Sequence, residues 1–97
     1  MPEPTGKKVL IIDDSATTRA VVKVYLAGYS LEFLEANNGQ DGLELARSAR
    51  PDAIIIDLKM PGMDGLTFCR RVRAEMAIRH VPIILITGSR GLDLRNE

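Results

Sequence analysis

Acidic and hydroxyl side chains follow the apolar runs of this chain at the point where each run ends. Asp13 and Asp14 follow "VLII", Asp57 follows "AIII", and Thr87 follows "PIILI". Carboxylate oxygens are ligands for Mg²⁺, and an aspartate beside Mg²⁺ and a hydroxyl can attack phosphorus to form an acyl phosphate. A single aspartate after a strand most often only caps a helix or turn. The four residues together favour a shared magnesium site over capping alone.

The elements that would position these residues alternate regularly along the chain. The expected strands are Val9–Ile12, Leu31–Ala36, Ala53–Ile56 and Pro82–Ile86, and the expected helices are Ser15–Ala27, Gly39–Ala49 and Gly65–Ala77. Three of the strands are apolar throughout, which is typical of parallel strands covered on both faces, whereas Leu31–Ala36 is mixed and suits an edge. The order βαβαβαβ with short connections predicts an α/β fold.

The predicted fold brings the polar residues together. The carboxyl ends of parallel strands lie side by side, and the crevice beyond them is where ligands bind. Asp13, Asp14 and Asp57 should therefore crowd one small site with Thr87. Like charges at this range raise one another's pKa, and a bound divalent cation removes that cost. Mg²⁺ is the expected cofactor.

Composition limits the classes of partner. The chain has 97 residues, with thirteen basic and thirteen acidic side chains and a single cysteine, Cys69. This length indicates one domain over residues 1–97, with a flexible N-terminus over 1–6. The charge balance, the short apolar runs and the single cysteine predict a cytoplasmic protein that binds neither nucleic acid nor membrane. The glycine-rich loops of nucleotide-binding proteins are absent from the sequence.

At the same residues the chain resembles the receiver domain of two-component response regulators and is similar to the single-domain chemotaxis receiver. The matching segments are "VLIIDDS", "NNGQDGLELA", "RPDAIIIDLKMPGMDG" and "VPIILITG", in that order and spacing, from about Lys8 to Gly88. The resemblance implies a flavodoxin-like (CheY-like), doubly wound parallel sheet of strand order 2-1-3-4-5.

The resemblance also implies a role for each acidic residue. Asp57 would be the phosphoacceptor. Asp14 and Asp57 would bind Mg²⁺ directly together with the backbone carbonyl of Lys59, and Asp13 would contribute through a water molecule. The implied phosphoryl donor is a histidine kinase or a histidine phosphotransfer protein. The chain would then be a phosphoacceptor that takes part in its own phosphoryl transfer, and not a turnover enzyme.

Two further residues are implied to lie at the phosphoryl group. Thr87 would hydrogen bond to it and so sense phosphorylation, which would switch a protein-interaction surface. The backbone of Gly88 would lie near it, at a position where the family often has alanine. We expect this difference to alter the lifetime of the phosphorylated form.

The sequence departs from the family pattern after Gly88. The family continues with a fourth helix, a fifth strand that carries a lysine before a proline, and a fifth helix. "SRGLDLRNE" can supply at most the start of the fourth helix, so the fifth strand and fifth helix are expected to be absent from this chain. The receiver would then be C-terminally incomplete, and the strand Pro82–Ile86 would be an uncovered edge.

The first predicted helix leads to the same expectation. The apolar side chains of Ala20–Leu26 cover roughly 240° of its circumference, which is more than one sheet face can bury. We therefore expect self-association, including domain swapping, or complementation by another polypeptide. Two functions stay open: a phosphorylatable signalling receiver, and a truncated or non-switching receiver that acts as a self-associating interaction module. An aspartyl phosphatase ranks last, because Lys59 stands where a second aspartate is usual.

Overall fold

Every strand and helix expected from the sequence is present in the computed structural model, which describes residues 6–86 and 94–96. The elements are β1 (Lys8–Ile12), α1 (Ala16–Tyr25), the 3-10 helix η1 (Ala27–Tyr29), β2 (Glu32–Ala36), α2 (Gly39–Ala49), β3 (Ala53–Asp57), α3 (Gly65–Arg73), β4 (Ile83–Ile86) and β5 (Leu94–Asn96). They form one sheet in the order β2-β1-β3-β4-β5, and the pairs β1–β2, β1–β3 and β3–β4 are parallel. The flavodoxin-like order 2-1-3-4 is confirmed.

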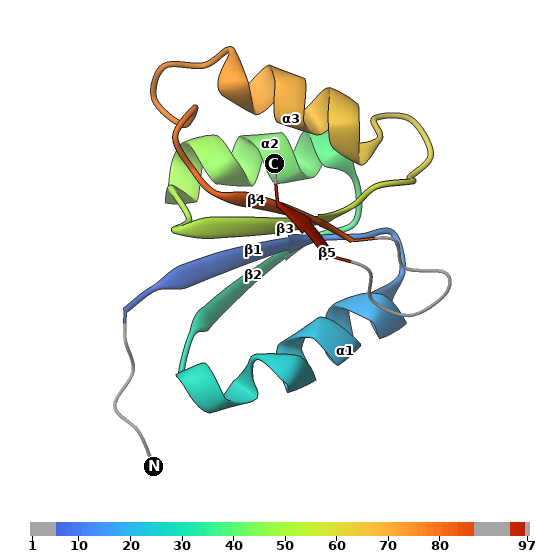
Figure 1. Ribbon diagram of the computed structural model, residues 1–97, viewed down its shortest axis with the longest axis vertical. Helices are drawn as coiled ribbons and strands as arrows, with labels where there is room; N and C mark the ends of the chain where they lie inside the picture. Colours follow the sequence, from blue (N-terminus) through green and yellow to red (C-terminus); the bar gives the residue numbers. More distant parts are fainter. Residues whose placement is uncertain (1–5, 87–93, 97) are drawn as a thin grey trace.

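The sheet is covered unequally on its two faces. Figure 1 shows α2 and α3 together on one face and α1 alone on the other. Successive side chains of β1 enter different cores, because strand side chains alternate between faces. Leu10 and Ile12 join the larger cluster with Phe68, and Val9 and Ile11 join the smaller one with Val22. Burial on both faces explains why the central strands are continuous apolar runs.

Side-chain caps begin the helices α1, α2 and α3 close to the carboxyl edge of the sheet. The pairs of cap residue and N–H donor are Ser15 with Thr18, Asn38 with Asp41, and Asp64 with Thr67. Each cap oxygen accepts a hydrogen bond from a backbone N–H group that the helix itself leaves unpaired. The caps therefore fix where the loops that follow β1, β2 and β3 turn into helix.

Helix α3 ends at Arg73, earlier than the predicted end at Ala77. The Arg73 guanidinium donates hydrogen bonds to the carbonyls of Arg79 and Val81, at 2.7 Å and 2.8 Å. These bonds draw the following segment back toward the helix end, so the chain turns toward β4 instead of continuing the helix.

The prediction that β4 is an uncovered edge is wrong. The backbone of Leu94–Asn96 pairs with it in the antiparallel direction, with Ile84 beside Asn96 and Ile86 beside Leu94. These residues were expected to contribute at most to a helix. A parallel fifth strand of the family type is not among the described residues; β5 takes the edge position instead. Edge pairing satisfies backbone groups of β4 that would otherwise face solvent.

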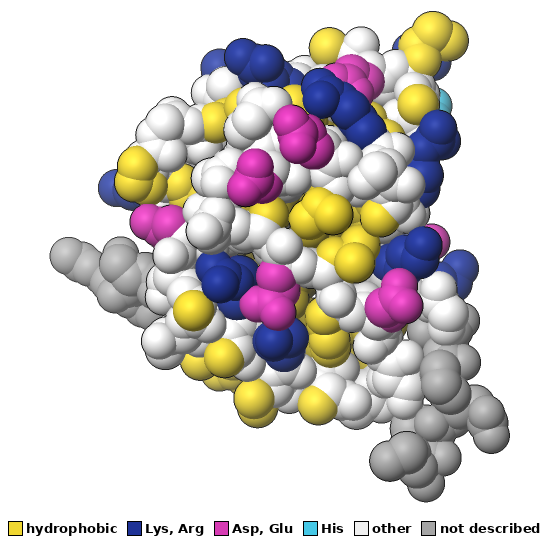
Figure 2. All heavy atoms as spheres, turned by 180° about the vertical axis from the view of Figure 1, so that it is seen from behind, with side chains coloured by type: hydrophobic (Ala, Val, Ile, Leu, Met, Phe, Trp, Pro, Cys, Tyr) yellow, Lys and Arg dark blue, Asp and Glu magenta, His cyan; other side chains and the backbone are white. Residues whose placement is uncertain are grey.

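The outer face of α1 is open, as the sequence predicts. Val22 is buried against the sheet, whereas Val24 and Tyr25 are 76% and 67% exposed. Tyr29 in η1 continues this apolar surface. Figure 2 shows hydrophobic side chains exposed along its lower edge, on the side of the molecule where α1 lies. A single helix leaves much of its own apolar surface in water on this face of the sheet.

Candidate phosphoacceptor and metal site

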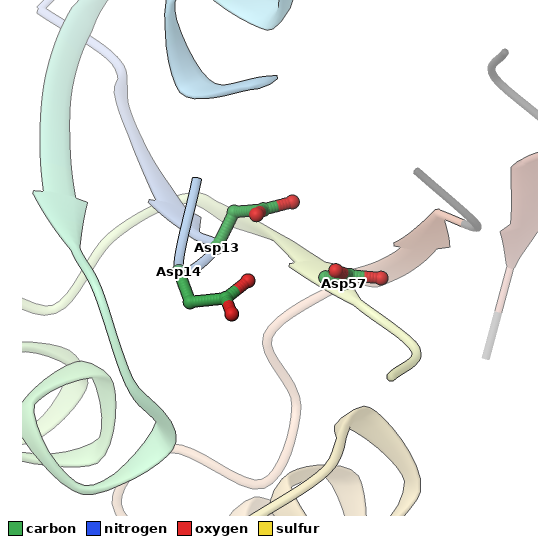
Figure 3. Close-up of side chains that lie close together, drawn as sticks. All are labelled: Asp13, Asp14 and Asp57. Atoms are coloured by element: carbon green, nitrogen blue, oxygen red, sulfur yellow. The ribbon is translucent and has the colours of Figure 1, made fainter. Parts of the chain in front are cut away.

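Three aspartates meet at the carboxyl edge of the sheet. Asp13 and Asp14 follow β1, and Asp57 is the last residue of β3. The two strands are parallel neighbours with Ile12 beside Ile56, so the residues that follow them are brought together. One carboxylate oxygen from each aspartate lies within 4.8 Å of the others. Figure 3 shows Asp13 and Asp14 extending from the end of β1 toward Asp57. The predicted convergence of these three residues is confirmed.

Asp13 is the buried member of the cluster, with only 1% of its surface exposed. Its Oδ1 accepts a hydrogen bond of 2.8 Å from the Ser15 N–H, and its Oδ2 has no hydrogen-bond partner among the described residues. Burial raises the pKa of Asp13 to about 6; the Ser15 hydrogen bond opposes this rise, and the charges of Asp57 and Asp14 add to it. The expected mutual repulsion is present, with burial as the larger cause.

These residues fit a small divalent cation. Mg²⁺ prefers oxygen ligands and usually takes one or two carboxylates while it keeps several water molecules. The cluster offers three carboxylates, and one of them has a buried oxygen that lacks a hydrogen-bond partner within the described part of the chain. Asp14 is exposed and Asp57 is half-buried, so water and a phosphoryl group can reach the site from solvent. A cation here would bind the Asp13 oxygen and would also relieve the repulsion among the three carboxylates.

The Asp57 carboxylate is held by the turn that follows β3. Its Oδ1 accepts a hydrogen bond of 3.2 Å from the backbone N–H of Lys59. The turn is fixed further by two backbone bonds, Leu58 N–H to the Ile86 carbonyl at 2.8 Å and Gly65 N–H to the Leu58 carbonyl at 3.1 Å. Asp57 is therefore placed by β3, β4 and the start of α3 together.

Other predicted site residues are placed only in part. Thr87 and Gly88 lie outside the described residues, so their roles stay predictions. Ile86, the residue before Thr87, lies beside Asp57 in the parallel register of β3 and β4. The Lys59 side chain is exposed, and its N–H group contacts Asp57. The role of the Lys59 carbonyl as a metal ligand stays a prediction.

One residue near the cluster was missed by the sequence reasoning. Arg19 in the second turn of α1 donates a hydrogen bond to the backbone carbonyl of Asp13 and a second to Glu35 on β2. An arginine six positions after an aspartate has no diagnostic meaning by itself. The relevant signal was a glutamate on the edge strand, able to pair with the first helix, but only the fold shows that the two meet.

Comparison with known proteins assigns the chain and its fold to a family. The family model described as response regulator receiver domain matches residues 9–97. The chain is 42% identical over 87 residues to the sensor histidine kinase CheAY of Helicobacter pylori, and 39% identical over 87 residues to the response regulator PleD of Caulobacter vibrioides. The first match covers 88% of this chain and 11% of the relative, and the second covers 87% and 18%. The chain thus spans a small part of these proteins.

Solved structures show the same likeness. The chemotaxis response regulator CheY4 of Vibrio cholerae is 36% identical, with a TM-score of 0.79 over 90% of this chain and 72% of that one. The N-terminal domain of a response regulator receiver protein from Methanoculleus marisnigri is 27% identical, with a TM-score of 0.78 over 84% of this chain and 67% of that one. Within residues 6–86 and 94–96, none of the helices has the length and apolar character needed to cross a bilayer.

Proposed function

The chain belongs to the response regulator receiver domain family, and on this premise we propose that it accepts a phosphoryl group on Asp57 in a Mg²⁺-dependent reaction. Its family places it in two-component signalling, where receiver domains interact with histidine kinases or histidine phosphotransfer proteins. The donor we propose is a phosphohistidine of such a partner. The output is a change in a protein-interaction surface.

The observation that carries this proposal is the cluster of Asp13, Asp14 and Asp57. Three carboxylates that each bring one oxygen within 4.8 Å of the others are costly in the absence of a cation. The buried Oδ2 of Asp13, which has no hydrogen-bond partner in residues 6–86 or 94–96, makes capping alone an insufficient explanation, because a cap would use that oxygen or leave it in solvent. The cluster also lies at the carboxyl edge of the sheet, where this class of fold binds ligands.

In the proposed reaction an oxygen of Asp57 attacks the phosphorus atom of the phosphohistidine. The new O–P bond makes an acyl phosphate, the P–N bond breaks, and its electron pair stays on the imidazole nitrogen, which takes up a proton. A bound Mg²⁺ would supply positive charge to the transferred group. Asp13, Asp14 and Asp57 would hold the ion with the Lys59 carbonyl. The Lys59 N–H bond keeps the Asp57 carboxylate oriented in the meantime.

Thr87 and Gly88 complete the proposal on the strength of the family resemblance. The Thr87 hydroxyl would donate a hydrogen bond to the phosphoryl oxygens, and the Gly88 backbone would border them. The added negative charge would then favour one of two arrangements of the surface around Thr87. The register of Asp57 with Ile86 supports this, because Thr87 follows Ile86 directly in the sequence.

A small-molecule acyl phosphate with Mg²⁺, followed by intact-mass measurement, tests the proposal. We expect a mass increase of one phosphoryl group that is lost in Asp57→Asn and in the presence of a chelator. Asp52→Asn is the matched control, because Asp52 is an exposed aspartate that lies before β3 and away from the cluster. An adduct that persists in Asp57→Asn would refute the assignment of the phosphoacceptor.

A second candidate is a self-associating interaction module, favoured by the exposed apolar surface of α1 and η1, which includes Val24, Tyr25 and Tyr29. In this case copies of the chain would cover that surface for one another, by domain swapping or by direct packing. Light scattering at micromolar concentration would show a mass above that of the monomer, reduced in Val24→Glu and unchanged in the control Thr17→Glu on the same helix. A compact monomer would count against this candidate.

A further inference from the structure

Arg19 joins the acidic cluster to the edge strand of the sheet. Its Nη1 donates a hydrogen bond to the backbone carbonyl of Asp13, and its Nε donates one of 2.9 Å to Oε1 of Glu35 on β2. Lys23, one turn further along α1, reaches the other oxygen of Glu35 at 2.8 Å. The two cations differ in their surroundings: the Arg19 side chain is 16% exposed, whereas that of Lys23 is 38% exposed.

These contacts close a ring of bonds around Asp13. The Asp13 N–H donates to the Ala36 carbonyl at 3.1 Å, and Ala36 is covalently joined to Glu35. Glu35 holds Arg19, and Arg19 returns to the Asp13 carbonyl. Hydrogen bonds from Lys23 and Arg19 hold the pKa of Glu35 below its ordinary value, so Glu35 remains a carboxylate at neutral pH and keeps its hold on the guanidinium.

The Asp13 carbonyl belongs to the peptide that leads into Asp14. This peptide lies after the end of β1 and before the first residue of α1, so neither element's hydrogen bonds fix its orientation. The Ser15 N–H bond fixes the Asp13 side chain. The bond from Arg19 fixes the peptide plane itself, and that plane sets the direction in which the Asp14 side chain leaves the backbone. Figure 3 shows that this direction brings the Asp14 carboxylate to the cluster.

We propose that Arg19 is a positioning residue for the metal site: by holding the Asp13 carbonyl, it orients the Asp13–Asp14 peptide so that both carboxylates face one cation. The inference rests on the proposed function, because it concerns the same Mg²⁺ site. Arginine suits this role because its planar fork can donate to two acceptors at once, which a lysine ammonium cannot do with the same fixed geometry. Partners that orient metal ligands in this way typically change affinity 10- to 100-fold when removed.

The first test is a calorimetric Mg²⁺ titration of four proteins: the wild-type chain, Arg19→Gln, Lys23→Gln and Glu35→Gln. We expect Arg19→Gln to weaken Mg²⁺ binding about tenfold or more. Lys23→Gln is the matched control, because it removes one positive charge from the same helix and the same glutamate but leaves the Asp13 carbonyl bonded; its affinity should stay within about twofold of the wild type. The Mg²⁺ affinity of Glu35→Gln should lie between those of the other two variants. In this variant Arg19 can still donate to the Asp13 carbonyl, but it no longer pairs with a charged carboxylate.

The second test needs no metal. In chelator, the backbone amides of Asp14 and Ser15 should change their NMR chemical shifts and exchange faster with solvent in Arg19→Gln than in Lys23→Gln. A purely structural ion pair would produce similar changes in both variants, since both contact Glu35. If Arg19→Gln fails to fold, Arg19→Lys replaces it; a lysine keeps the charge without the fork, and we expect a severalfold loss of Mg²⁺ affinity.

The outcomes separate the two proposals. Equal Mg²⁺ affinities and equal Asp14 and Ser15 amide signals in the Arg19 and Lys23 variants would overturn the role of Arg19 and leave the proposed function intact. A wild-type chain that takes up no Mg²⁺ would overturn the proposed metal site, and the amide signals alone would then decide whether Arg19 orients the peptide. A loss of Mg²⁺ affinity and a change in the Asp14 and Ser15 amide signals in the Arg19 variants, with Lys23→Gln close to the wild type in both measurements, supports the proposal.

Discussion

At the scale of the residue, the buried carboxylate of Asp13 lowers the stability of the fold but belongs to the proposed metal site. Its burial and its acidic neighbours raise its pKa to about 6, whereas the ordinary value is 3.8. Between these two values the folded protein binds more protons at Asp13 than the unfolded chain does, so the free energy of unfolding falls as pH rises through this window. A shift of this size corresponds to about 3 kcal/mol lost at neutral pH in the metal-free protein.

The variant Asp13→Asn tests this account. We expect it to be more stable than the wild type at pH 7 in chelator, by about 1–3 kcal/mol, and to lose the decline in stability between about pH 4 and pH 6. Urea unfolding followed by circular dichroism across this range measures both effects. An amide at this position can still accept the Ser15 N–H bond through its oxygen, so the substitution removes the buried charge and keeps that contact.

The control for this prediction is Asp52→Asn. The Asp52 carboxylate is exposed and accepts a hydrogen bond from the Lys8 N–H. The Asp52→Asn variant should retain the decline in the free energy of unfolding from pH 4 to pH 6. A wild-type protein whose stability in chelator is constant over this range, or a decline that survives in Asp13→Asn, would contradict the assignment of the titration to Asp13.

At the scale of the element, close contact between α3 and β3 holds Asp57 in place. A Cβ atom added at Gly65 would lie 2.8 Å from the Asp57 carbonyl oxygen, 2.9 Å from Cδ2 of Leu85 and 3.0 Å from Cα of Leu58. Two of these neighbours are backbone atoms, which cannot rotate away. Only glycine therefore allows the start of α3 to approach the end of β3 so closely.

Gly65→Ala should move the start of α3 away from β3 and carry the Asp57 turn with it. We expect a loss of about 1–3 kcal/mol in the free energy of unfolding and slower phosphorylation of Asp57 by a small-molecule acyl phosphate. Gly28→Ala is the matched control, because a Cβ at Gly28 meets no atom of the described residues within 4 Å. If both variants behave as the wild type in urea and in the phosphorylation assay, the contact does not position Asp57.

The elements also show which features a sequence can predict. Runs such as Ile54–Ile56 are buried on both faces, so their composition alone indicates a covered parallel strand. The pairing of Leu94–Asn96 with β4 could not be predicted, because "LRN" has neither an apolar run nor an alternating pattern, and the pairing uses backbone groups that every residue has. The end of α3 depends on bonds from Arg73 to carbonyls six and eight residues away.

The candidate site also has features that the sequence predicts and features that it does not. The acidic residues were predictable, because strand ends in a parallel sheet converge and the aspartates stand directly after the runs. The difference in exposure between Asp13 and Asp14 was not, since adjacent residues in a loop can face either way until the helix cap fixes them. The contact of Arg19 with Asp13 needs three elements to be in place, β1, β2 and α1, and no local spacing encodes it.

At the scale of the whole molecule, the acidic edge is a local feature of a chain with no formal net charge. Attraction for a cation must therefore come from the few groups at the carboxyl edge of the sheet and not from a long-range field. Those groups are held from opposite faces of the fold: the loop that bears Asp13 and Asp14 leads into α1, which Ser15 caps, and the start of α3 packs against the turn after Asp57 (Figure 1). Binding a cation there links the two sides of the sheet.

This link predicts that Mg²⁺ stabilises the whole fold. A ligand that binds only the folded state adds about 2.7 kcal/mol to the free energy of unfolding when its concentration is 100 times its dissociation constant. Measured by urea unfolding, the effect should be larger at pH 8 than at pH 5, because protons compete with the ion for Asp13, whose pKa is about 6. Asp57→Asn should reduce it, and sodium chloride of equal ionic strength should not reproduce it. An equal gain in Asp57→Asn, or with sodium chloride, would mean that Mg²⁺ acts only by screening and that the three carboxylates do not share an ion.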